Sequence, residues 1–96
     1  MITQDFDRTL EIVSQVTEID KEKIISSCRQ KEYVEARVLL IKSLSEQGYH
    51  YRTIAAYMER AATSVKALLD GFPQRHADNP LFRKLHTEIL RKVEGK

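Results

Sequence analysis

The segment formed by residues 31–47 constrains the fold more than any other part of the sequence. Its apolar residues recur every three or four positions, which is the period of an α-helix with a buried face. They are Val34, Val38, Ile41 and Leu44, with Ala36 and Leu40 widening the stripe. Gly48 follows directly, and glycine adopts without strain the left-handed conformation that ends many helices. We therefore predict a long helix that ends at Gly48.

The residues before this helix predict two further helices and a loop. Apolar residues at helical spacing indicate an amphipathic helix from about residue 4 to 17. Asp20 then occupies the position of an N-cap for a short helix, with Ile24 and Ile25 on its apolar side. Residues 26–30 break the pattern and are expected to form a loop.

The residues after Gly48 predict three further helices. Two short ones cover residues 49–58 and 62–69, and Gly71 and Pro73 are expected to end the second, so that residues 72–78 form a loop. Asn79 and Pro80 make an N-cap and first-turn pair for a last helix that reaches about residue 94. The fold class predicted for residues 1–96 is a single all-α, compact domain of about six helices.

Size and composition exclude several classes of protein. A chain of 96 residues has no room for an ordinary catalytic domain beside another module. Its apolar runs, such as Val38–Ile41, are far short of the roughly 20 residues that a membrane span needs. The first 20 residues carry acids rather than a basic region followed by an apolar one. We therefore expect a cytoplasmic protein without a membrane partner.

Chemistry-bearing residues are too few and too scattered to predict a reaction. Cys28 is the single cysteine, so the sequence offers neither a disulfide nor a cysteine-based zinc site. His50 is expected near a helix start, His76 in a loop and His86 on a helix exterior, which does not make a ligand set. Because no nucleophile, acid and base can be grouped, we expect no enzymatic activity, no metal and no cofactor.

Charge is unevenly distributed along the chain although the net charge is only +2. Residues 1–26 carry three more acids than bases, whereas residues 72–96 carry three more bases than acids. Because the chain is acidic at its start and more basic afterwards, its later residues could bind an anionic partner.

Residues 55–65 follow the pattern of a helix-turn-helix. Ala55 is a small residue where two helices would cross closely, and Met58 is an apolar anchor at the end of the first. A short turn follows, and Val65 is a β-branched residue for the inner face of the second helix. Glu59 stands where glycine is most usual. The pattern favours a nucleic-acid-binding motif, although any helical hairpin with a tight crossing needs similar residues.

A longer set of residues carries a resemblance to a known family. In order along the chain these are Val13, Ile19, Glu22, Ile24, Ile25, Ser26, Arg29, Lys31, Val34, Ala36 and Arg37, followed by Arg60, Thr63, Ser64 and Val65. In this order they resemble the DNA-binding C-terminal domain of the bacterial replication initiator DnaA, which has a Trp-repressor-like helix-turn-helix. The resemblance runs without gaps from Val13 to Arg37 and continues through the motif to the last helix.

The resemblance implies a set of DNA-binding residues. Arg29 falls on the family's minor-groove arginine, and Lys31 and Arg37 fall on positions that favour phosphate. Arg60 would meet a phosphate at the start of the recognition helix, where the helix dipole assists. The side chains implied for the outer face of that helix are Thr63, Ser64 and Lys66.

Two departures from the family concern base recognition. Ala61 and Ala62 stand where the family has Asp and His, and alanine can touch a thymine methyl group but offers no hydrogen bond to a base edge. The expected function is double-stranded DNA binding by a regulator or a replication accessory factor that lacks the initiator's ATPase module. The alternative is a protein-interaction module that kept the fold and lost DNA reading.

The last predicted helix leaves a second choice open. Its apolar stripe of Phe82, Leu85, Ile89 and Val93 is expected to pack back on the domain, as in the family. The alternative is that this broad apolar face also serves a homodimer or a protein partner.

Overall fold

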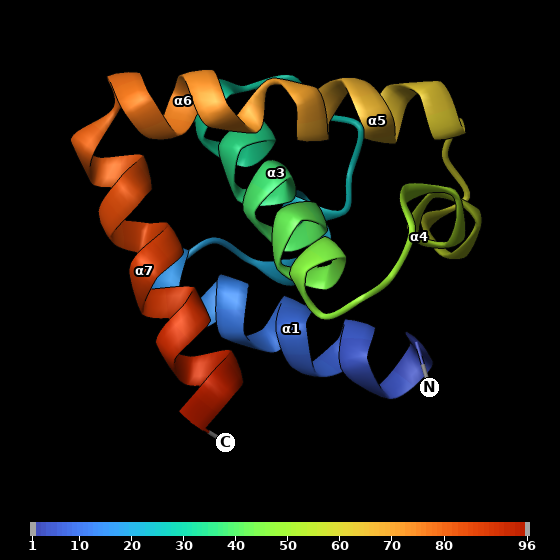
Figure 1. Ribbon diagram of the computed structural model, residues 1–96, viewed down its shortest axis with the longest axis horizontal. Helices are drawn as coiled ribbons and strands as arrows, with labels where there is room; N and C mark the ends of the chain where they lie inside the picture. The colour runs from blue at the N-terminus through green and yellow to red at the C-terminus, as the bar shows by residue number, and fades with distance from the viewer. Residues whose placement is uncertain (1, 96) are drawn as a thin grey trace.

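Helix α3, Lys31–Glu46, runs through the middle of the protein in the computed structural model, which describes residues 2–95 (Figure 1). Four consecutive residues of this helix, Val38–Ile41, are completely buried. Because an α-helix turns once in 3.6 residues, four consecutive buried side chains cover all of its sides. The α3 helix is therefore enclosed all round, more deeply than a stripe on one face predicts.

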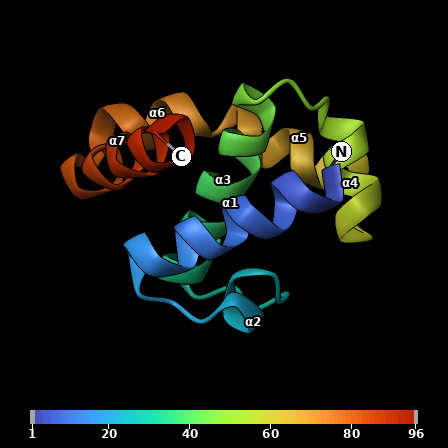
Figure 2. The same cartoon turned by 90° about the horizontal axis from the view of Figure 1, so that it is seen from below.

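The other helices enclose α3 from different directions. Helix α1, Ile2–Thr17, crosses one face of α3, with α7, Pro80–Gly95, on one flank and α4, Tyr51–Met58, on the other (Figure 2). The single turn α2, Lys21–Ile24, packs on α1 and α3. Helices α5, Ala62–Asp70, and α6, Phe72–Asp78, run along the edge above α3 in Figure 1. Buried apolar side chains from every helix join in one core cluster.

The all-α prediction is confirmed. Within residues 2–95 the structure has six helices of seven or more residues and the single turn α2, and it has no strand. The Cα radius of gyration is 12.0 Å, close to the roughly 12.5 Å expected of a compact chain of this length. None of the helices in this part of the chain has both the length and the apolarity that a membrane crossing requires.

Two predicted helix ends have the chemistry that the sequence indicated. Gly48 has a φ of +106°, and its N–H donates to the carbonyl of Ser45 while the N–H of Tyr49 donates to that of Leu44. This is the Schellman arrangement that ends α3. At the start of α7, Oδ1 of Asn79 accepts from the N–H of Phe82 at 3.1 Å.

The N-cap predicted at Asp20 is correct only in position. Its backbone carbonyl accepts from the N–H groups of Lys23 and Ile24, but its side chain makes no capping hydrogen bond.

The prediction of a loop at residues 72–78 is wrong, since these residues form α6. Gly71 keeps nearly helical angles, φ −80° and ψ −9°, so the backbone continues in the same direction from α5. Pro73 lies in the first turn of α6, where its missing N–H has no helical partner to lose. Phe72 is buried against the ring of Phe82, with 5.6 Å between centroids, and this contact fixes the new helix in the core.

The exterior position expected for His86 is also wrong. Its side chain is 7% exposed, its ring packs edge-on against Phe72, and its Nε2 lies 3.3 Å from Oε1 of Glu46. Because α7 packs back on α1, α3 and α6, Phe82 and Ile89 face inward with His86. The broad apolar face of the last helix is therefore used inside the chain.

Candidate functional site

The turn between α4 and α5 is joined to the loop of residues 25–30 by Arg60. Its NH2 nitrogen donates to the backbone carbonyls of Ile25, at 2.8 Å, and of Ser26, at 2.6 Å. Arg60 is brought there by Glu59, which adopts the left-handed conformation with a φ of 57° and ends α4. The loop and the start of α5, distant in sequence, are thereby fixed side by side.

Arg37 holds the same loop from beneath. Its side chain is 4% exposed, and its guanidinium donates from Nε to the carbonyl of Ile24 at 2.8 Å and from NH2 to that of Cys28 at 3.1 Å. Burial lowers the pKa of Arg37, and the positive charge of Arg60 lowers it further. A guanidinium remains charged in proteins at all ordinary pH values. We call Arg37 and Arg60 together the arginine clamp.

Arg37 has a structural role in the clamp that the sequence did not predict. Arg37 was expected to contact phosphate, yet its donors are directed into the loop and not to the surface. Helical spacing could have indicated that Arg37 is buried, because position 37 falls between Val34 and Ile41 on the buried face of α3. A buried charge needs several hydrogen bonds, and the carbonyls of a loop without regular structure can supply them.

The first turn of α5 is open to solvent on its outer side. Thr63 and Ser64 are exposed, whereas Val65 points into the core and is fully buried. Ala61 is the N-cap residue and provides no side-chain acceptor for the first amides of the helix. These amides and the two hydroxyl groups are therefore available to an external ligand.

Lys66 lies one turn further along α5 and is paired with an acid. Its Nζ is 3.0 Å from Oδ2 of Asp70, and both side chains are more than half exposed. The hydrogen bond that Lys66 donates to this carboxylate, together with the negative charge of Asp70, raises the pKa of Lys66. The positive charge on the outer face of α5 is thus partly offset within the helix.

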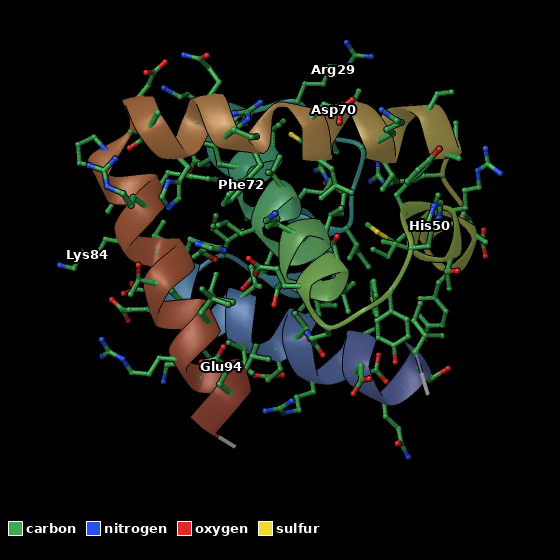
Figure 3. The ribbon with its side chains drawn as sticks, in the orientation of Figure 1. Arg29, His50, Asp70, Phe72, Lys84 and Glu94 are labelled. Atoms are coloured by element: carbon green, nitrogen blue, oxygen red, sulfur yellow. The ribbon has the colours of Figure 1, made fainter. Side chains whose placement is uncertain are left out.

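Arg29 extends outward beyond the line of α5 and α6 (Figure 3). It belongs to the clamped loop, so it lies on the same edge of the protein as α5. Lys31, two residues later, begins α3 and lines a cavity of about 480 Å³. Sequence reasoning missed two other residues of that cavity, Gln74 and Arg75 of α6, because it took their segment for a loop.

Both acidic and basic side chains line this cavity. Its other walls include Glu35 and Asp78, and NH1 of Arg75 lies 3.9 Å from Oε2 of Glu35. The cations Lys31 and Arg75 therefore have acids close by, and the cavity does not form a concentrated anion site.

The structure thus brings together some of the expected site residues and separates others. Arg29, Arg60, Thr63 and Ser64 lie on adjoining parts of one edge, with Lys66 one helical turn on. Lys31 borders the neighbouring cavity, and Arg37 is beneath the loop. Arg29, Arg37, Arg60 and Lys66 do not form one continuous exposed positive face.

In the part of the chain that the structure describes, no group of three or more His, Cys, Asp and Glu residues is arranged to hold a metal ion. Cys28 is exposed and unbridged. Comparisons of the chain with protein-family models, with curated proteins and with solved structures found no match.

Proposed function

We propose that this chain binds double-stranded DNA, with α4 and α5 acting as a helix-turn-helix and residues 25–30 as a second contact. The observation that carries this proposal is the link from Arg60 to the carbonyls of Ile25 and Ser26. It holds the loop that bears Arg29 beside the exposed first turn of α5. The two surfaces that would contact a duplex, the loop and the start of α5, are thereby held in a fixed position relative to one another.

The packing of α4 on α5 supports the motif. In Figure 1, α4 is seen nearly end-on while α5 runs across the view, so the two helices cross at a steep angle. Ala55 and Val65 are 2% and 0% exposed, as the inner residues of such a crossing should be. The turn between the helices consists of residues 59–61.

The outer surface of α5 would supply the contacts with DNA. Its uncapped N-terminus favours a phosphate, and the charge of Arg60 adds to this attraction although its NH2 group is bound to the loop. Arg29 extends from the loop towards a neighbouring groove or phosphate. Thr63 and Ser64 could donate to or accept from base edges, while Ala61 and Ala62 could not. Most of the affinity would therefore come from the sugar–phosphate backbone, and base discrimination would be modest.

A role as a regulator or replication accessory factor follows from the resemblance to the C-terminal domain of DnaA. The modest base reading proposed here suits a factor that accompanies another DNA-bound protein.

The test is the fluorescence anisotropy of a labelled duplex of random sequence, titrated with the protein at about 50 and 200 mM salt. We expect binding that weakens steeply with salt, and an Arg29→Ala variant that binds several-fold less tightly. The matched control is Arg91→Ala, which removes an equally exposed arginine at the far end of α7. Absence of binding at the lower salt, or equal losses in the two variants, would contradict the proposal.

A second candidate is a protein-interaction module, and one feature favours it. Two exposed apolar side chains, Ile25 and Tyr57, line the same hollow of about 170 Å³, together with Phe6 and Met58. This function predicts no salt-dependent duplex binding, and it predicts that Tyr57→Ser abolishes binding of the protein partner. The DNA titration separates the two candidates, since only the first predicts salt-dependent binding that Arg29→Ala reduces.

A further inference from the structure

Leu81 is the most exposed large apolar side chain in residues 2–95, with 64% of its surface accessible. It lies in the first turn of α7, at the edge of a hollow of about 240 Å³. The apolar walls of this hollow come from α3, α7 and the segment after α1. They are Ile19, Ala36, Leu39, Leu85 and Leu81 itself. A protruding leucine therefore stands directly beside an apolar hollow.

The rim of the hollow is acidic. Glu18 and Glu32 line it, and neither forms an ion pair with any residue in the described part of the chain. Glu35 also borders the hollow, but it accepts a hydrogen bond from Asn79 and lies near Arg75. Two uncompensated carboxylates thus remain on this side.

The neighbourhood of Leu81 carries the opposite charge. Lys84 follows three residues later on the same side of α7, and its side chain extends away from the protein (Figure 3). It too has no ion pair within residues 2–95. One surface therefore combines a protruding leucine with a cation and an adjacent apolar hollow with two anions.

We propose that a second copy of this chain binds to this surface about a two-fold axis. In a symmetric dimer the same patch serves both partners, so it must be complementary to itself. Leu81 of each copy enters the hollow of the other, and Lys84 of each copy faces Glu18 and Glu32 of the other. This surface carries a cation beside the protruding leucine and two anions beside the hollow, so it is complementary to itself. A foreign partner would need a surface of only one sign of charge, and the arrangement therefore favours a second copy. The inference is independent of DNA binding.

The first test is sedimentation velocity of the protein without DNA, at concentrations from about 10 μM to 1 mM. We expect a monomer–dimer equilibrium whose dissociation constant rises at least about tenfold in Leu81→Ser, because the apolar surface that Leu81 buries in the hollow of the other copy is lost. The control is Ile25→Ser, which removes an exposed apolar side chain from another surface. Circular dichroism checks that both variants remain folded.

The second test exchanges the charges. Lys84→Glu alone, or Glu18→Lys with Glu32→Lys, places like charges opposite one another in the dimer and should weaken association about fivefold. Combining all three substitutions should restore it. A protein that stays monomeric throughout the range overturns the proposal. So does a dimer that Leu81→Ser leaves unchanged, or a combined variant no better than its parents.

Discussion

The Nε of Arg37 donates to the backbone carbonyl oxygen of Ile24 at 2.8 Å, across the end of α2. This bond and the one to Cys28 make Arg37 the buried half of the arginine clamp. Since the side chain is almost fully enclosed, its loss would leave loop carbonyls without partners in a region that water reaches poorly.

We therefore expect Arg37→Ala to lower the free energy of unfolding by about 3 kcal/mol, because several hydrogen bonds from a charged donor are lost together. Urea unfolding followed by circular dichroism measures this. Arg37→Lys should recover only part of the loss, since an ammonium lacks the planar fork that reaches two carbonyls at once. Arg91→Ala, at an exposed site, should change the stability by less than about 0.5 kcal/mol. Equal effects of Arg37→Ala and Arg91→Ala would show that the clamp contributes nothing.

The pair formed by Lys66 and Asp70 gives a prediction about DNA binding. Asp70→Asn removes a negative charge from the outer face of α5 and releases the ammonium of Lys66 for a phosphate. The affinity for a random duplex should rise, and the salt dependence should steepen by about one counterion. Glu94→Gln makes the same change in charge near the end of α7, far from α5 in Figure 3, and should have little effect. An unchanged affinity in Asp70→Asn would place the duplex elsewhere on the protein.

The hydrogen bond from the Tyr49 hydroxyl to the carboxylate of Asp5 predicts a pH dependence of stability. This bond, with burial and the negative charge of Asp5 adding to it, raises the pKa of Tyr49 in the folded state above its ordinary value of about 10. The folded state then holds the proton more tightly than the unfolded state does. The stabilisation is complete below about pH 10 and is lost as the pH rises through the folded pKa.

Tyr49→Phe should therefore be less stable than the parent near neutral pH, and the difference should shrink in alkaline solution. Urea midpoints measured at several pH values above about 8 will show this convergence. A difference between the two proteins that grows with rising pH would contradict the assigned direction of the shift.

Gly48 offers a test of backbone strain at the end of α3. Its φ of +106° is one that residues with a Cβ rarely adopt, and no atom lies within 4 Å of where a Cβ would stand. Any cost of Gly48→Ala is therefore conformational and not steric, and we expect about 1–2 kcal/mol. Gly95→Ala is the control, because that glycine also has open space and lacks the positive φ. Thermal unfolding by calorimetry would compare the two.

The sequence predicted the parts of the fold that depend on local chemistry. The Schellman end at Gly48 and the N-cap at Asn79 follow from residue types whose effects act within a few positions. Helix α6 could not be found in this way, because Gly71 and Pro73 are read as helix breakers when the core contact of Phe72 is unknown. Tertiary packing here outweighs local preference.

The candidate site likewise combines features that local sequence predicts with features that depend on residues distant in the sequence. That Thr63 and Ser64 are exposed and Val65 is buried follows from helical periodicity alone. That Arg37 and Arg60 bind loop carbonyls does not, since each bond joins residues at least nine positions apart. A sequence shows that an arginine is present, but the distant backbone decides whether its donors are free. DNA binding by this edge stays a prediction.

The junction at Gly71 has a mechanical consequence. The N–H of Gly71 donates to the carbonyl of Ala67, and the carbonyl of Gly71 accepts from the N–H of Arg75, so the last bond of α5 and the first bond of α6 share one residue. Helices α5 and α6 are therefore joined without an intervening loop. Val65 anchors α5 in the core, and Phe72 packs the start of α6 against Phe82 of α7. Because the two helices meet at Gly71 and each is anchored in the core, a shift of α5 on ligand binding would be passed on to the packing of α6 against α7.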